Sequence, residues 1–188
     1  MNMKKITSWD DVNIGQYQEI MSIQTTNKIS KFIESLSILL DCDPQVIRDM
    51  NMKDYNKLVA DAQFLSKQPE SVIEKIIEID GKRYGMIPDM TLIDAGVFID
   101  AEQFKEESIE NLHYLTALVY RPIVKEDGDE YEIDKHKAEG FEKRANLFKE
   151  KVSVEMVMGA VLFFSLVEMR LLEGLITSFL QDNQTMEI

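Results

Sequence analysis

The feature that constrains this chain most is an apolar run from Met156 to Val167, with Glu155 before it and Glu168 after it. A helix that crosses a bilayer needs about 20 apolar residues, so this run is too short to span one. Apolar residues occupy nearly every face of the helix that it would form, which is typical of a buried helix. We therefore expect a helix at the centre of the fold, capped by Ser153 and continuing to about Leu180.

The N-terminal part of the chain predicts several short helices, because start signals recur before apolar residues at helical spacing. The start signals are, in chain order, Asn13 with Gln16, then Thr25 or Thr26, then Asp43 with Pro44, and then Asn51. The second helix has an apolar face made of Ile29, Phe32, Ile33, Leu36, Leu39 and Leu40, and the fourth has one made of Tyr55, Leu58, Val59, Ala62 and Leu65. Gln68-Pro69 ends this helical part.

A β-hairpin is predicted from Ser71 to Ile87, because two alternating runs are joined by Asp80-Gly81. A type I′ turn needs positive φ at both central residues, and Asp-Gly is one of the pairs that adopt it readily. The register that this turn imposes gives two cross-strand pairs, Glu78 with Arg83 and Ile77 with Tyr84.

Two more helices are predicted after the hairpin, one from Thr91 or Asp94 to about Phe104 and one from the acidic stretch 106–110 to Val119. The segment from Ile123 to Ile133 follows, with Asp127-Gly128 at its centre. It is either a second hairpin or an exposed acidic loop.

The charged stretch from Lys135 to Val152 predicts a helix with one narrow apolar seam. The seam residues, spaced like a heptad stripe, are Ala138, Phe141, Ala145, Phe148 and Val152. A helix with such a stripe lies at the surface or against one partner helix. The seam and the acidic segment together give a candidate interaction surface, whose residues are Phe141, Ala145, Phe148, Asp127, Asp129 and Glu130.

These elements predict an α+β fold that is mainly α: a helical bundle with one inserted β-hairpin at about 71–87. Helices precede and follow the hairpin, so we expect a single domain over residues 1–188, with the hairpin insertion at 71–88 and the C-terminal helices at 135–182. A chain of 188 residues buries roughly two thirds of its unfolded surface, which is enough for a core without disulfides.

The composition argues against several classes of partner. The formal net charge is −13, which repels phosphate backbones, and the densest basic stretch, Lys135 to Lys151, is interleaved with acids, so we expect no nucleic-acid partner. The single cysteine, Cys42, excludes an intrachain disulfide and favours a reducing compartment. Residues Met1 to Trp9 lack the apolar stretch of a signal peptide.

No motif in the sequence predicts catalysis, a cofactor or a small-molecule substrate, and no Gly-rich phosphate loop is present. Glu110 and His113 form one Glu-x-x-His pair, but a di-iron bundle needs two such pairs and two further glutamates. The second histidine, His136, has Ile133 where the pair would need a glutamate. We therefore expect no metal site.

Two further patterns would predict a calcium site and a nucleophilic thiol, and neither is complete. An EF-hand counted from Asp127 would need a glycine and a glutamate where the sequence has Glu132 and Ala138, so the acidic segment is better interpreted as solvated. Cys42 lies between two aspartates, whose charges raise the pKa of a thiol and disfavour a nucleophilic role.

The order of these signals resembles a family of small proteins encoded by tailed bacteriophages of Bacteroidetes, including crAss-like phages. The stretches that carry the resemblance are VNIGQYQEI from Val12, SILLDCDPQVIRDM from Ser37, IDAGVFIDAEQF from Ile93, ENLHYLTALVYRPI from Glu110 and GAVLFFSLVE from Gly159. The resemblance implies a helical, non-catalytic protein of virion assembly. No family active site comes with it.

The functional hypothesis is therefore a structural or assembly protein of the portal, neck or tail region, which acts through contacts with other phage proteins and with copies of itself. Such a protein would be found in the host cytoplasm during assembly and, in the structural version, in the virion. Three alternatives stay open: a tail assembly chaperone absent from the mature virion, a small acidic regulator of a basic host protein, and a metal-dependent enzyme built on Glu110 and His113.

Overall fold

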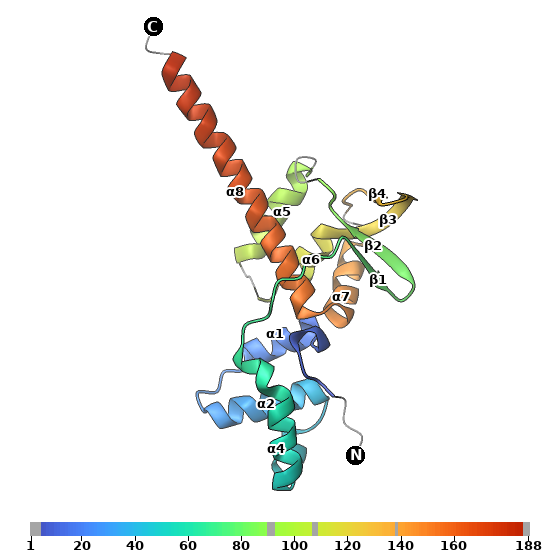
Figure 1. The fold of residues 1–188 in the computed structure, drawn as a ribbon, viewed down its shortest axis with the longest axis vertical. Helices are drawn as coiled ribbons and strands as arrows, with labels where there is room; N and C mark the ends of the chain where they lie inside the picture. Colours follow the sequence, from blue (N-terminus) through green and yellow to red (C-terminus); the bar gives the residue numbers. More distant parts are fainter. Residues whose placement is uncertain (1–4, 90–92, 107–108, 138, 186–188) are drawn as a thin grey trace.

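The computed structural model describes residues 5–89, 93–106, 109–137 and 139–185 (Figure 1). The fold is α+β and mainly helical, with a four-stranded antiparallel sheet, which confirms the predicted fold class. The molecule has two regions: the α2–α4 lobe, residues 28–66, and the body, which contains the sheet and helices α5 to α8. The first helix, α1, lies between them.

The helices are α1 (Ile14–Ser22), α2 (Lys28–Leu40), α3 (Pro44–Arg48), α4 (Met52–Asp61), α5 (Ala95–Glu106), α6 (Leu112–Val119), α7 (Phe141–Lys151) and α8 (Val154–Thr185), with 3₁₀ turns η1 (Trp9–Asp11) and η2 (Ala62–Ser66). The strands are β1 (Ile76–Ile79), β2 (Lys82–Met86), β3 (Tyr120–Asp127) and β4 (Glu130–Ile133).

Side-chain caps start the helices α1, α3 and α4, as the sequence predicts. Asn13 accepts a hydrogen bond from the backbone N–H of Gln16 (2.8 Å), and the Gln16 side chain accepts one from the backbone N–H of Asn13 (3.2 Å). Asp43 and Asn51 cap α3 and α4 in the same way. Each cap satisfies a backbone donor that the helix itself leaves open.

The predicted cap of α2 is wrong. Asn27, and not Thr25 or Thr26, accepts hydrogen bonds from the backbone N–H groups of Ile29 and Ser30, both at 3.0 Å. Asparagine is a stronger helix cap than threonine, so α2 starts after Asn27 and not after Thr25 or Thr26.

The start of α8 is held by backbone pairing and not by the predicted serine cap. The Val154 N–H donates to the Val12 carbonyl (2.9 Å), and the Ile14 N–H donates to the Val152 carbonyl (3.1 Å). Ser153 forms an antiparallel bridge with Asn13, and its hydroxyl has no hydrogen-bond partner among the described residues. The bridge fixes the N-terminal segment to the junction of α7 and α8.

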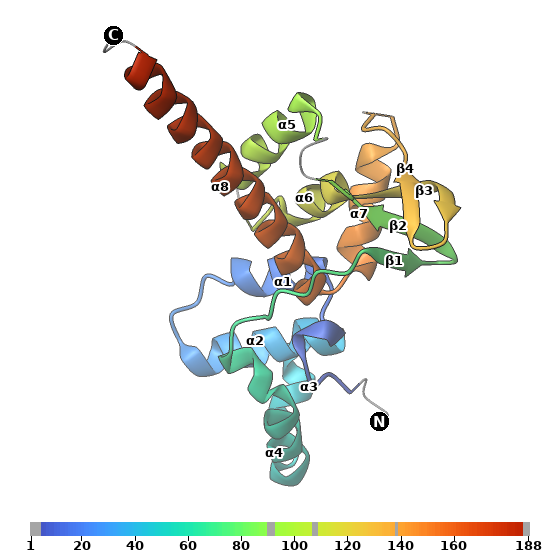
Figure 2. The same cartoon turned by 45° about the horizontal axis from the view of Figure 1, so that its top comes forward.

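An extended segment, the strap (residues 67–75), connects the α2–α4 lobe to the sheet and crosses the first turns of α8 (Figure 2). The Trp9 indole donates to the Lys67 carbonyl (2.9 Å), and the Val72 N–H donates to the Glu155 carbonyl (3.0 Å). A β-carbon at Gly159 would lie 2.0 Å from the Val72 carbonyl oxygen. Only glycine therefore allows the strap to lie this close to the helix.

The predicted hairpin at Asp80-Gly81 is present, with the predicted register. Ile77 pairs with Tyr84 and Glu78 with Arg83. The two turn residues have φ of 51° and 75°, as a type I′ turn requires. Its strands are shorter than the predicted 71–87 unit, because residues 71–75 belong to the strap.

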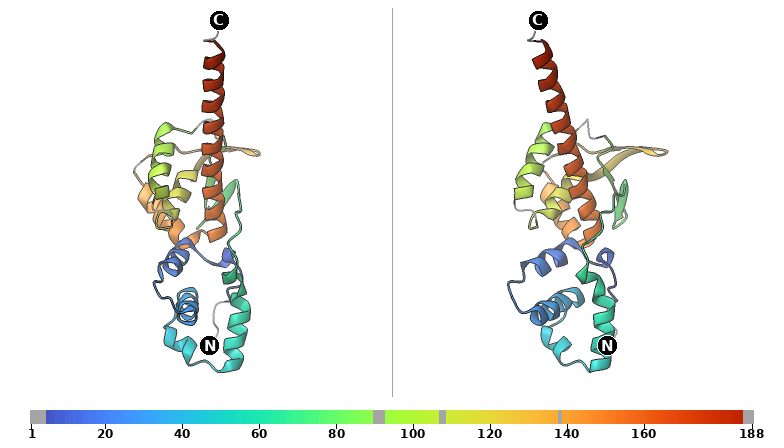
Figure 3. Two further views of the ribbon diagram at one scale, coloured as in Figure 1. Left: turned by 90° about the vertical axis from the view of Figure 1, so that its left-hand side faces the viewer. Right: turned by 60° about the vertical axis from the view of Figure 1, so that its left-hand side comes forward.

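The acidic segment 123–133 forms a second hairpin, β3–β4, so the loop alternative is wrong. The sheet order is β1-β2-β3-β4, and the first hairpin is therefore part of a larger sheet and not an isolated insertion. β3 pairs with β2 at its start and with β4 after a bulge near Ile123. Figure 3 shows the β3–β4 hairpin projecting from the side of the molecule.

Tyr131 of β4 folds back over Gly85 of β2. Its hydroxyl oxygen lies 2.8 Å from the carbonyl oxygen of Met86 and 3.0 Å from that of Lys75, so its single proton is shared between the two carbonyls. A β-carbon at Gly85 would lie 2.4 Å from the tyrosine ring, so glycine is needed for this contact. The hairpin is thereby fixed to both the sheet and the strap.

The first half of α8 lies at the centre of the fold, as predicted. Its buried residues are Val154, Val157, Ala160, Phe163, Phe164 and Val167. They pack against α6, which is itself almost entirely buried, and against the sheet. Within the part of the chain that the structure describes, no helix is both long enough and apolar enough to cross a membrane.

Three apolar clusters run through the molecule. The largest joins the sheet with α5 to α8, the second surrounds Trp9, and the third lies inside the α2–α4 lobe. Tyr17 and Met158 pack against the first two clusters, and Leu65 packs against the last two. The third cluster is small: its buried members are Ile33, Leu36, Ile47 and Ala62.

Candidate functional site

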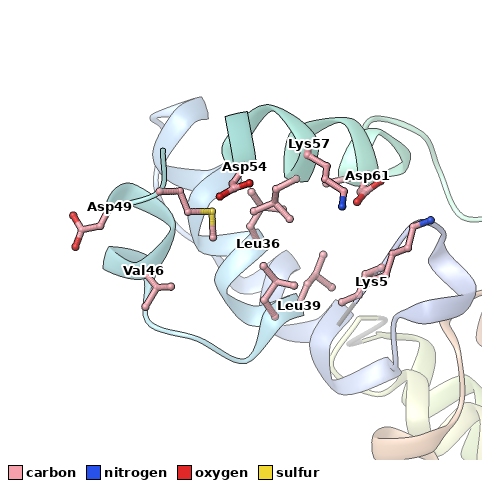
Figure 4. Close-up of a pocket in the computed structure, with 13 residues that line it drawn as sticks. Lys5, Leu36, Leu39, Val46, Asp49, Asp54, Lys57 and Asp61 are labelled. Carbon is pink, nitrogen blue, oxygen red and sulfur yellow. The ribbon is translucent and has the colours of Figure 1, made fainter. Parts of the chain in front are cut away.

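An open groove lies inside the α2–α4 lobe, bounded by α2, α3, α4 and the segment around Lys5 (Figure 4). Its volume is about 700 Å³. Apolar residues from all four boundaries line it: Ile6, Leu36, Leu39, Leu40, Val46, Met50, Leu58 and Ala62. We call this hollow the α2–α4 groove.

The groove lies beside α4, which is packed only loosely on the rest of the lobe. Asn51 caps its start, and at its other end the chain continues directly into η2, where Ala62 is buried. Between these points all ten residues of α4 are described, and none of them is buried. Its apolar residues Tyr55 and Leu58 are half-buried against the third cluster, and Leu58 also lines the groove.

Charged side chains surround the apolar floor unevenly. Figure 4 shows Asp54, and farther out Asp49, toward α3, whereas Lys57, Asp61 and Lys5 lie at the other end. Asn51 donates to the Asp54 carboxylate (2.7 Å) and Gln45 donates to that of Asp49 (2.8 Å), so neutral amides orient both acids. One end of the groove is thus acidic, and the other carries both lysines together with Asp61.

An apolar floor with a charged rim suits the apolar face of a helix from another protein, because such a helix buries its anchor residues and leaves its polar residues at the edge. The nearby thiol does not suggest catalysis. Burial raises the pKa of Cys42, and the charges of Asp43 and Asp41 raise it further, so the reactive thiolate is disfavoured at neutral pH.

The predicted seam of α7 is largely used inside the chain. Ala145 and Phe148 are fully buried, and Phe148 meets the ring of Tyr84 edge-on at 5.0 Å. They are therefore not an exposed surface, and a charge at Phe148 would disrupt the core. The heptad spacing identified an apolar face correctly but could not identify its partners, which are α6 and the sheet.

The helix that carries the seam is also shorter than predicted. It begins at Phe141, because Gly140 has a φ of 76°, a left-handed conformation that is not part of an α-helix. Phe141 is half-buried and stacks with Phe104 and Tyr114, with ring centres 6.1 and 5.8 Å away. Ala138 lies outside the described residues.

The acidic half of the predicted surface is exposed, at the tip of the β3–β4 hairpin. Asp127, Asp129 and Glu130 are all exposed there. Asp129 and Glu130 also border a second pocket of about 520 Å³, whose other lining residues are Ile73, Lys75, Met86, Ile87, Pro88, Tyr131 and Phe163. The buried seam residues and the exposed hairpin tip do not form one continuous surface.

His113 has a structural role. It is buried, and its Nδ1 lies 3.2 Å from the side-chain nitrogen of Gln18, which also donates to the carbonyls of Ile109 and Glu110. Burial, with a smaller effect of Lys149, lowers the pKa of His113 to about 4. It is therefore neutral at pH 7.

The structure adds an ionisable pair that the sequence did not suggest. His136 and Asp100 lie 2.9 Å apart between the turn after β4 and α5. No local spacing connects them, so only the fold brings them together. Within the described residues, no group of three or more histidine, cysteine, aspartate or glutamate side chains is placed to hold a metal ion.

The sequence also did not reveal the α2–α4 groove. The amphipathic pattern of α4 was visible, but whether its apolar face is covered depends on how α2, α3 and α4 are spaced. The chain matches no protein-family profile, no curated protein and no solved structure.

Proposed function

We propose that this protein is a non-catalytic structural or assembly protein of a tailed bacteriophage, and that it binds another protein of the particle through the α2–α4 groove. The ligand is an amphipathic helix, which places aliphatic residues on the groove floor and charged residues at the rim.

The observation that carries the proposal is the state of α4. All ten residues of this amphipathic helix are at least partly exposed, so its contacts with the third cluster, through Tyr55 and Leu58, cover only part of its apolar face. A helix bound in the groove would cover Leu58 and the floor residue Leu36 together, and burial of apolar area contributes about 25 cal/mol per Å². A bound partner helix would therefore bury the apolar face that the lobe leaves exposed.

The hairpin tip supports a second contact. Asp129 and Glu130 stand beside a pocket whose lining includes Ile73, Met86 and Phe163. An apolar side chain flanked by lysine or arginine would fit this combination, because the chain's net charge of −13 attracts basic partners over a longer range.

The phage setting comes from the sequence resemblance. The stretches that carry it include the cap of α1, the α2–α3 junction and the centre of α8, all of which are architectural. The proposal therefore takes its setting from these stretches and its binding site from the groove.

The test is quantitative mass spectrometry of purified particles, with copy number referenced to the major capsid protein. We expect a fixed, ring-like number of wild-type copies. Leu58→Glu, which places a charge in the groove, should reduce incorporation at least about tenfold, because a buried anchor residue dominates such contacts. Met52→Glu is the matched control: Met52 lies on the same helix and is 67% exposed, but it does not line the groove.

The outcomes separate the alternatives. Normal incorporation of Leu58→Glu would refute the groove as the binding site. Abundance in infected cells combined with absence from particles would replace the structural role with that of an assembly chaperone. Absence from particles, with one basic host protein bound stoichiometrically at the hairpin tip in infected cells, would favour the regulator.

A further inference from the structure

A buried polar contact joins Gln18 of α1 to His113 of α6. Gln18 is 9% exposed and His113 is 6% exposed. The side-chain nitrogen of Gln18 lies 2.7 Å from the carbonyl oxygen of Glu110, 2.8 Å from that of Ile109 and 3.2 Å from Nδ1 of His113. One amide therefore ties α1 both to α6 and to the turn that precedes it.

The two backbone carbonyls fix the orientation of the Gln18 amide. Only an N–H group can lie this close to two carbonyl oxygens, so the nitrogen, and not Oε1, faces the turn. Oε1 is buried and has no hydrogen-bond partner among the described residues. Because the amide nitrogen can only donate, Nδ1 of His113 must accept, and the neutral ring carries its proton on Nε2.

Protonation of His113 removes this acceptor. The charged ring donates from both of its nitrogens, so its Nδ1–H would point at the side-chain N–H groups of Gln18. Rotation of the amide by a half turn does not repair the contact. It would place Oε1 against the carbonyl oxygens of Ile109 and Glu110, which have no proton to donate. Neither orientation of Gln18 therefore suits the charged ring.

The surroundings do not compensate the charged ring. Burial, with a smaller effect of the Lys149 ammonium on α7, lowers the pKa of His113 to about 4. The ring of Tyr114 has its centre 4.1 Å from that of His113. The nearest acids along the two elements, Glu19 on α1 and Glu110 before α6, are exposed. The charged ring is therefore more stable outside this contact than within it.

We propose that Gln18 and His113 form an acid-sensitive latch, which holds the second half of α1 to the turn before α6 and releases it when the ring takes up a proton. The start of α1 stays in place, because the bridge between Asn13 and Ser153 fixes it separately. Since α1 leads into α2 through residues 23–27, release loosens the attachment of the lobe to the body. The latch is independent of the proposed function, because neither of its two residues lines the α2–α4 groove.

Hydrogen exchange of the full chain between pH 7 and pH 4, corrected for the intrinsic exchange rate at each pH, tests the latch. The open latch binds a proton with the ordinary histidine pKa of 6.5 and the closed latch with a pKa of about 4, so acid favours opening. The opening equilibrium of residues 18–22 and 109–113 should rise about 100-fold over this range. Residues 157–164 of α8 should stay more protected than either segment.

The decisive variant is His113→Gln, because its side chain can still contact Gln18 but does not titrate. Its opening equilibrium should change less than about threefold between pH 7 and pH 4. His136→Gln is the matched control: it removes the other histidine, which pairs with Asp100, and leaves the latch intact. This control should keep the rise seen in the wild type.

Three results would overturn the latch: opening of residues 18–22 that does not depend on pH, a rise that persists in His113→Gln or is lost in His136→Gln, and exchange of these residues only together with α8. If His113→Gln does not fold, nitrogen NMR of the imidazole in the wild type replaces it. The proton should lie on Nε2 and the ring should titrate near pH 4. A proton on Nδ1, or titration near pH 6.5, would overturn the proposal.

Discussion

In the body, α7 buries Ala145 and Phe148 completely against α6 and the sheet, whereas in the α2–α4 lobe the similarly long α4 buries none of its described residues. Both helices are amphipathic, and both are charged on their outer side. The difference lies in what covers the apolar face. The body holds its fold together with such faces, and the lobe leaves one of them partly open.

Substitution in the body should have the largest effect on stability. Phe148→Ala should lower the free energy of unfolding by about 4 kcal/mol, because a fully buried ring is lost and its cavity is closed in by α6 and the sheet. Urea denaturation followed by circular dichroism measures this. A loss below about 1 kcal/mol would mean that the body is no better packed than the lobe.

The contact between the strap and α8 should come next. Gly159→Ala should cost about 3 kcal/mol, because the added methyl group meets the backbone carbonyl of Val72 and the helix or strap must shift. Gly96→Ala in α5 is the matched control. A β-carbon there meets nothing within 4 Å, so the same substitution should raise helix stability by about 0.5–1 kcal/mol. Equal effects at the two glycines would contradict the close approach.

Acid should weaken the body through His113. Its pKa is about 4 when folded and 6.5 in the ordinary state, so between these values the unfolded chain binds a proton that the folded chain does not. Stability attributable to this group is present above pH 6.5 and falls by about 2–3 kcal/mol as the pH drops to about 4. Unfolding free energies of the wild type and His113→Gln, compared at several pH values, isolate this contribution. Identical pH profiles would show that His113 is not buried as described.

The smallest effect on stability is expected in the lobe. Leu58→Ala should cost about 1 kcal/mol or less, because the side chain is only half-buried and its loss leaves no closed cavity. The same denaturation measurement tests it, and a loss as large as that of Phe148→Ala would show the groove to be part of a sealed core. The comparison is sharpest if Leu58→Ala also weakens partner binding.

The parts of the fold that follow from neighbouring residues were predictable from the sequence. Asp80-Gly81 fixes the first hairpin and its register, and Asn13 with Gln16 fixes the start of α1, since the groups involved lie within a few positions of one another. The central placement of α8 could be predicted from the run Met156 to Val167, because nearly every face of the helix that it forms is apolar.

The rest depended on residues distant in the sequence. That β3 joins β2 in one sheet, that α7's seam faces α6, and that Val72 lies against Gly159 are matters of packing that local patterns do not contain. The prediction of the candidate site was the least accurate for this reason. Its predicted aromatic and aliphatic half, Ala145 and Phe148, is in the core, and the groove that replaces it exists only through the spacing of three helices.

The bridge between Asn13 and Ser153 also sets an order of events during synthesis. Its backbone bonds join Val12 and Ile14 to Val152 and Val154, so the N-terminal segment cannot make them until all of α7 and the start of α8 have been translated. Contacts between residues so far apart slow folding, because a long loop must close before they form. The N-terminal segment therefore lacks this backbone partner for most of the time in which the chain is translated.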